Sequence, residues 1–304
     1  MFNYQKLLII LTVISVILSI GAIKYFFSIN SLIAVKKNTD LSSIIGHDIK
    51  DTQCKFATIG HLYSITQEPK ILNQLVMQLN AKNFDAVIFA GDLTVDGTEK
   101  QWEVVNKFLS KINSKVLFVP GNHDLINKKS RDNWLKYVGY LSQEMLINEC
   151  NFILLNSTNS MVADFKWDKI VSGNGIDDTG IEILKHIDAN RTNLVFMHHT
   201  LYSSDLWLVD HESPNEHDQN AVLQEKKWNK YIVPLLRKKV KLVYTGDWHS
   251  RIVSITVRDG IVYIANGLAK VSKFSKDNKL TYTSTYVKDN GIIINRIIPI
   301  TLSK

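Results

Sequence analysis

The chain has 304 residues, of which 45% are hydrophobic and 21% are charged, and its formal net charge is +7. This apolar content is enough to bury a sizeable core, which excludes disorder over most of the length. The positive charge is spread out, without an arginine-rich tract or an alternation of basic and aromatic residues, so it favours an anionic small molecule or surface over nucleic acid. We therefore expect a globular body that does not bind nucleic acid.

The N-terminus is apolar and uncharged from Leu7 to Ile23, and it continues mostly apolar after Lys24. A bilayer-spanning helix needs about 20 such residues, so we predict a retained single-pass anchor. A cleaved signal peptide is the main alternative, but the pattern of small residues before a cut is poor. Lysines flank both ends of the segment and leave the side of the membrane open. The predicted organisation is an anchor region at 1–34 with its span at 7–27, a polar tether at 35–53, and one domain at 54–304.

In the body, short runs rich in β-branched and aromatic residues alternate with segments of helical periodicity, which predicts an α/β layered domain. Two later pairs of runs, joined at Asp259-Gly260 and near Asn290-Gly291, are typical of hairpins, and we expect both in a second sheet. The predicted strands lie at 55–59, 85–90, 115–119, 151–156, 193–197 and 241–245, and the predicted helices at 69–81, 99–112 and 225–239.

Five of these six strands are followed by histidine, aspartate or asparagine, in the segments GHLY, GDLTVDG, GNHD, HHT and GDWH. Ligands of open α/β sheets bind beyond the carboxyl ends of the strands. Carboxylate and amide oxygens together with imidazoles suit Mn, Fe or Zn better than Ca. The residues that could form such a site are Asp92, Asn122, His123, His198, His199, Asp247 and His249.

The segments GDLTVDG, VPGNHD, FMHHT and GDWHSR, in this order, resemble the calcineurin-like metallophosphoesterase family. The resemblance implies a four-layer αββα sandwich, a site for two metal ions, and hydrolysis of phosphomonoesters or phosphodiesters by metal-activated water. By the same resemblance, Asp92 would bridge the metals, Asn122 and His198 would hold one of them, and His249 would help to hold the other. His123 would assist the leaving group or the transition state.

Two motifs depart from the family pattern. The first motif is Asp-x-His in the family, and an ungapped match puts His61 in place of the aspartate and Tyr63 in place of the histidine. A gapped match keeps His61 as the histidine and deletes the aspartate. If both His61 and Tyr63 are ligands, they favour a harder ion such as ferric iron, and if neither binds, the site holds one metal or none. The last motif is Gly-His-x-His, and here Asp247 replaces its first histidine, which is a mild change because a carboxylate can hold the same metal.

Four further residues carry weaker signals. His199 and Arg251 are candidate contacts for the substrate, although Arg251 fits a surface arginine equally well. Cys54 and Cys150 lie in no zinc-binding spacing, and we expect two buried thiols beside strands, with a disulfide as the alternative.

Three functional hypotheses follow. The first is a membrane-tethered phosphoesterase that acts on a phosphate ester of the cell envelope. The second is a phosphodiesterase for a nucleotide. The third is a catalytically degenerate member of the fold that serves as a scaffold or binding subunit of a membrane complex.

Overall fold

The computed structural model describes residues 52–158, 176–200, 228–247, 253–267, 280–289 and 291–300. All of them belong to one compact unit, Asp51–Lys304. The predicted anchor, His249 and Arg251 lie outside the described residues. Within the described ranges, no helix is both long and apolar enough to cross a membrane.

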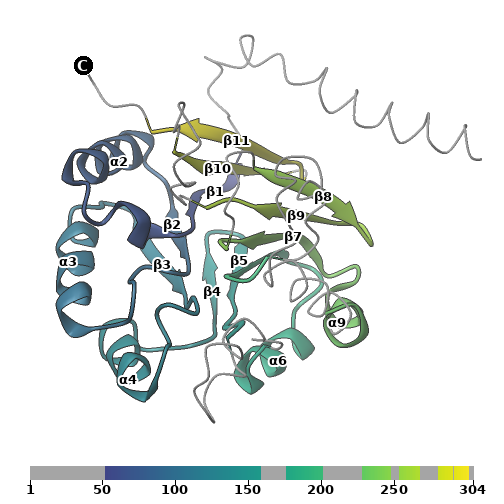
Figure 1. Ribbon diagram of the computed structural model, residues 1–304. Coiled ribbons are helices and arrows are strands. Elements are labelled where there is room, and N and C mark those ends of the chain that lie inside the picture. The colour runs from purple at the N-terminus through teal and green to yellow at the C-terminus, as the bar shows by residue number, and fades with distance from the viewer. Residues whose placement is uncertain are drawn as a thin grey trace, which may run out of the picture. The chain divides into compact units, whose positions relative to one another are not determined.

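Two sheets form the centre of the domain (Figure 1). The first has the strand order β11-β10-β1-β2-β3, and the second has the order β4-β5-β6-β7-β9-β8. The strands of the first sheet are β1 (Thr52–Ile59), β2 (Ala86–Ala90), β3 (Lys115–Val119), β10 (Thr281–Lys288) and β11 (Ile293–Pro299). Those of the second are β4 (Gln143–Ile147), β5 (Cys150–Leu154), β6 (Thr192–Met197), β7 (Val240–Thr245), β8 (Ser254–Arg258) and β9 (Ile261–Ala265).

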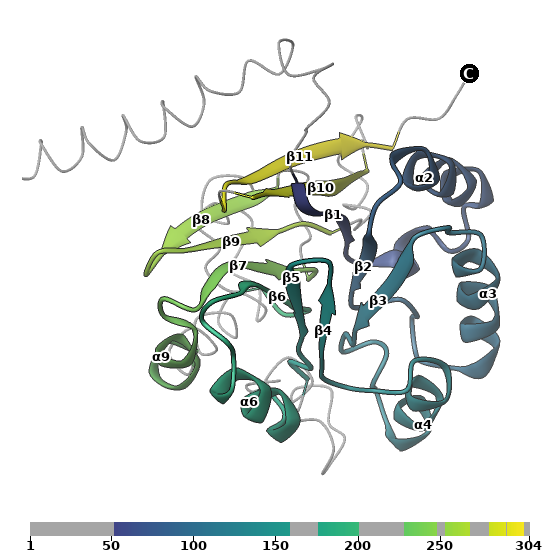
Figure 2. The same cartoon turned by 180° about the vertical axis from the view of Figure 1, so that it is seen from behind.

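Helices cover the outer face of each sheet, as Figure 2 shows from behind. The first sheet packs against α2 (Pro69–Lys82), α3 (Glu99–Leu109) and α4 (Lys128–Tyr137), and the second against α6 (Asp178–Lys185), η3 (Trp228–Ile232) and α9 (Val233–Leu236). A third apolar cluster fills the space between the sheets. Three cores separate four layers, so the predicted αββα sandwich is confirmed.

The helix predictions succeed where the local signals are strong. Segments 69–81 and 99–112 match α2 and α3, and α2 has Pro69 in its first turn, where proline is tolerated. The third predicted helix, 225–239, is described only from Trp228, as a π-helical turn followed by the short α9. Pro234 lies in the first turn of α9, and because it has no N–H it cannot continue the hydrogen bonding of the preceding turn.

The two predicted hairpins exist, but only one is in the expected sheet. β8 and β9 pair antiparallel around Asp259 and Gly260, both with positive φ. β10 and β11 also pair antiparallel, yet β10 pairs with β1, so this hairpin extends the first sheet. Its assignment to the second sheet was wrong, because turn residues define a hairpin but not the strand edge to which it adds.

The expectation of two free thiols was also wrong. Cys54 on β1 and Cys150 on β5 form a disulfide, with their Cα atoms 6.1 Å apart and both side chains fully buried. The bond joins the two sheets across their shared core. The two positions are 96 residues apart, so only the stacking of the sheets brings them together.

Candidate functional site

The carboxyl ends of both sheets meet at one edge of the sandwich. Gly246 lies so close to the first sheet that a Cβ on it would be 1.8 Å from the carbonyl oxygen of Ala90. A Cβ on Gly60 would in turn lie 2.3 Å from the carbonyl oxygen of Gly246. Only glycine permits this approach. The polar residues after the strands are thereby gathered, with His61 after β1, Asp92 after β2, Asn122 after β3, His198 after β6 and Asp247 after β7.

Asp92 lies at the centre of this cluster and is buried. Its Oδ1 is 3.3 Å from His198 Nε2, and its Oδ2 is 3.7 Å from His61 Nε2. Burial raises the pKa of Asp92, while the neighbouring His61 and His123 oppose that rise. Its backbone has φ 56°, a left-handed conformation that costs a non-glycine residue on the order of 1–3 kcal/mol, although aspartate adopts it more readily than most residues. One carboxylate therefore faces imidazoles from both sheets.

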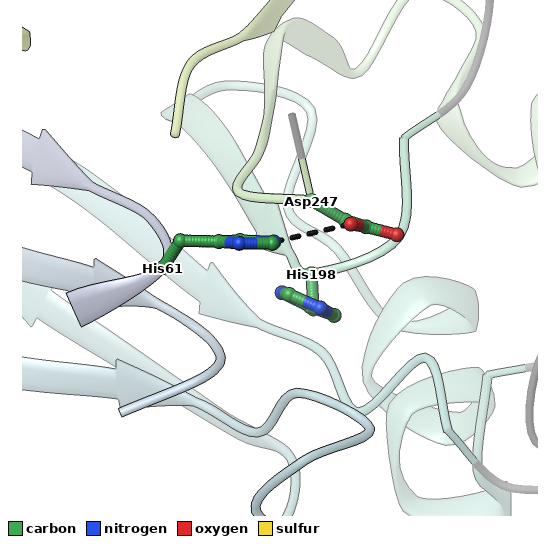
Figure 3. Close-up of side chains that lie close together, drawn as sticks. All are labelled: His61, His198 and Asp247. Carbon is green, nitrogen blue, oxygen red and sulfur yellow. Dashed lines mark hydrogen bonds and ion pairs between the residues drawn. The ribbon is translucent and has the colours of Figure 1, made fainter. Parts of the chain in front are cut away.

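His61 and Asp247 face each other across the gap between the sheets (Figure 3). His61 Nε2 lies 3.1 Å from Asp247 Oδ1. One potential ligand atom from each of His61, His198 and Asp247 lies within 4.8 Å of the others. This spacing suits three side chains around a metal ion.

The contacts of the His198 ring are those expected of a metal ligand. Its Nδ1 lies 3.0 Å from the carbonyl oxygen of Ala90, and its Nε2 lies 3.0 Å from Asn122 Oδ1. Burial lowers the pKa of His198, which favours the neutral ring. A neutral ring has one N–H, and if that N–H donates to Ala90, the lone pair of Nε2 points at oxygen acceptors of Asn122 and Asp92. Metal-binding histidines share this arrangement, with the second nitrogen bonded to a carbonyl, so these residues fit a cation.

Asp124 joins the loop after β2 to the loop after β3. Its carboxylate accepts hydrogen bonds from the backbone N–H of Leu93, Thr94 and Gly121, at 3.2, 2.9 and 3.0 Å, and from the Thr94 hydroxyl at 2.8 Å. Burial, together with the Asp92 carboxylate, raises the pKa of Asp124 to about 6. The GNHD motif contains this residue, but the motif alone does not assign it a role. It positions the loops that carry Asp92 and Asn122.

His123 is oriented by two contacts. Its backbone N–H donates to Asp92 Oδ1 at 3.1 Å, and its Nδ1 lies 2.7 Å from the Val95 carbonyl oxygen, which can only accept. Because Nδ1 contacts the Val95 carbonyl oxygen, Nε2 is the nitrogen of this half-buried ring that can contact another group. The Tyr63 ring lies 4.9 Å from the His123 ring and 5.5 Å from the His61 ring. Burial, with the nearby carboxylates of Asp92 and Asp247, raises the pKa of Tyr63 to about 12.

A buried serine on the second sheet was missed by the sequence reasoning. Ser157 follows β5, and its Oγ accepts a hydrogen bond from the backbone N–H of His199 at 3.2 Å and lies 2.8 Å from His199 Nδ1. The His199 ring lies 5.1 Å from the His198 ring. The available signal was a hydroxyl residue after the fourth predicted strand, at the position where the other strands carry ligand-type residues.

The structure therefore brings together most of the residues singled out by the sequence. His61, Tyr63, Asp92, Asn122, His123, His198, His199 and Asp247 all lie in or beside the cluster. His249 and Arg251 lie outside the described residues and stay predictions.

The fold and this cluster define a four-layer α/β sandwich with a histidine and carboxylate site at its strand ends. The family model for calcineurin-like phosphoesterases matches residues 52–251. The chain therefore belongs to the calcineurin-like phosphoesterase family.

Individual relatives are distant. The chain is 23% identical over 181 residues to the 3',5'-cyclic adenosine monophosphate phosphodiesterase CpdA of Haemophilus influenzae, an alignment that covers 58% of this chain and 61% of that protein. It thus matches less than two thirds of the relative's length. A purple acid phosphatase from yellow lupin (Lupinus luteus) seeds is similar with a TM-score of 0.54 and 11% identity, over 81% of this chain and 51% of that one. A phosphopantetheinyl hydrolase from Mycobacterium tuberculosis has a TM-score of 0.48 and 11% identity, over 74% and 94%.

Proposed function

We propose that this protein is a metal-dependent phosphoesterase that hydrolyses a phosphomonoester or phosphodiester. The observation that carries the proposal is the convergence of buried acceptor atoms around Asp92. Carboxylates that converge with an amide and imidazoles in a protein interior are costly to bury, and a bound cation would offset the charge of the carboxylates.

Two transition metal ions are proposed, drawn from Mn, Fe or Zn. Asp92 would serve both ions, and His198 and Asn122 would hold one of them. His61 and Asp247 complete the set, with His249 and Tyr63 as further candidates. When bound, such ions lower the pKa of water and screen the charge of phosphoryl oxygens.

The residues of the chain contribute orientation and proton transfer. His123 is held by Asp92 and by the Val95 carbonyl, so its Nε2 is the ring nitrogen that can meet a substrate. In its protonated form, this nitrogen would donate to a phosphoryl or leaving-group oxygen. His199 and Arg251 are proposed to contact the substrate. The pairing of His199 with Ser157 would fix the orientation of the imidazole ring.

We further propose that the segment 7–27 tethers the domain to a membrane and that the domain lies on the non-cytoplasmic side. The disulfide between Cys54 and Cys150 supports that side, because disulfides persist in oxidising compartments and are rare in the cytosol. An anchor would hold the enzyme near a phosphate ester of the envelope. The similarity to CpdA favours a nucleotide phosphodiester as the second candidate substrate.

The test of catalysis is metal content by elemental analysis together with hydrolysis of bis(p-nitrophenyl) phosphate. Asp92→Asn should lose bound metal and at least about a hundredfold in turnover, because it removes the shared carboxylate. Asp132→Asn is the matched control, since Asp132 is exposed on α4 and pairs only with the exposed Lys128 in the described contacts. A wild-type protein without metal or turnover after reconstitution would favour the scaffold function instead.

The test of location is thiol trapping of the full-length protein from intact cells. A maleimide polymer applied after denaturation should shift the protein only if a reductant is added first. A shift without reductant would mean free thiols and would overturn the non-cytoplasmic assignment. Cys54→Ala with Cys150→Ala provides the unshifted control.

A further inference from the structure

We propose that His61 and Asp247 are a compensated exchange of ligands. In the ungapped match of the first motif, the family pattern has a carboxylate at the position of His61, and in the last motif it has an imidazole at the position of Asp247. In this chain each position carries the side chain of the other. The inference rests on the proposed function only in assuming that the cluster binds a cation.

The geometry carries this inference, because the two exchanged side chains are in direct contact. His61 follows β1 in the first sheet and Asp247 follows β7 in the second, and 186 residues separate them in sequence. Nevertheless, His61 Nε2 lies 3.1 Å from Asp247 Oδ1. Both side chains reach the same small volume beside Asp92, so either position can deliver a carboxylate or an imidazole to it.

The exchange conserves the charge of the cluster. Asp92 and one further carboxylate remain, together with the imidazoles of His61 and His198. A single change would not conserve it. His61→Asp would add a third carboxylate to the cluster that holds Asp92 and Asp247, where neighbouring like charges cannot all ionise readily. Asp247→His would leave Asp92 as the one carboxylate of this group.

The backbone also permits either residue at position 61. His61 has φ 54°, and histidine and aspartate are both among the residues enriched in this left-handed region. The carboxylate that is missing from the first motif is therefore supplied by Asp247 from the opposite sheet. The exchange keeps two carboxylates and two imidazoles among Asp92, Asp247, His61 and His198.

A double-mutant cycle tests the exchange. The four proteins are wild type, His61→Asp, Asp247→His and the double variant, each measured for Mn²⁺ affinity, metal-free melting temperature and turnover. Each single variant should bind Mn²⁺ at least about tenfold more weakly, and the double variant should return to within about threefold of wild type. Exchange of an exposed pair, Lys128→Asp with Asp132→Lys, is the matched control and should leave Mn²⁺ affinity unchanged.

Three outcomes would overturn the inference. In the first, the loss of Mn²⁺ affinity in the double variant equals the product of the losses in the two single variants. In the second, the single variants change only the metal-free melting temperature, which would make the contact a structural ion pair. In the third, the wild type binds no Mn²⁺. Coupled Mn²⁺ binding without turnover would instead contradict the proposed function and leave the exchange standing.

Discussion

The loops of the first sheet hold their site residues differently from the loops of the second. After β2 and β3, the buried Asp124 carboxylate cross-links the two loops through four hydrogen bonds. After β6 and β7, the backbone itself makes the link, since the N–H groups of Gly246 and Asp247 both donate to the His198 carbonyl oxygen, at 3.0 and 2.7 Å.

The second sheet also depends on the first for orientation. The His198 ring is fixed by the Ala90 carbonyl oxygen at the end of β2. The first sheet thus builds a pre-organised half of the site on its own. The half on the second sheet is oriented only when the two sheets are packed against each other. A site of this kind should be sensitive to anything that loosens the contact between the sheets.

The largest expected effect comes from cutting the bond between the sheets. Cys54→Ala with Cys150→Ala should lower the free energy of unfolding by about 2–4 kcal/mol, because the bond restricts the unfolded chain. Urea unfolding measures the change. Reductant should destabilise the wild type but not the variant, and equal stability of the two proteins under oxidising conditions would contradict the prediction.

A smaller effect is expected when the first half-site alone is disturbed. Asp124→Asn replaces one acceptor oxygen with an amide group that faces N–H donors, and it should cost about 1–3 kcal/mol of stability. Mn²⁺ affinity should fall about tenfold, because Asp92 and Asn122 lose their common support. Isothermal titration calorimetry would measure the affinity, with Asp132→Asn as the control. An unchanged affinity would show that Asp124 has a structural role only.

The smallest effect is expected on the second half-site. Ser157→Ala removes the Oγ that contacts His199 and should cost about 0.5–1.5 kcal/mol. If His199 contacts the substrate, KM for the aryl phosphodiester should rise while Mn²⁺ affinity stays constant. Ser110→Ala, at an exposed helix end, is the control. A fall in Mn²⁺ affinity would instead place His199 among the groups that support the metal ligands.

The layered α/β fold and most residues of the site could be predicted from the sequence alone. Strand patterns and the residues that follow each strand are local features, and parallel strands bring their carboxyl ends to a common edge. Asp92, Asn122, His123 and His198 were therefore predictable without coordinates. The same locality explains why α2 and α3 were predicted almost to their ends.

The features that join distant segments depend on how the two sheets pack, and they did not follow from the sequence. The disulfide between Cys54 and Cys150, the pairing of β10 with β1, and the contact between His61 and Asp247 each depend on which strand lies beside or opposite which. Neither composition nor spacing encodes that choice, because it is made by the packing of two sheets over one apolar core. For the same reason, the sequence shows that the first motif lacks its carboxylate, but only the packing of the sheets shows that Asp247 faces His61.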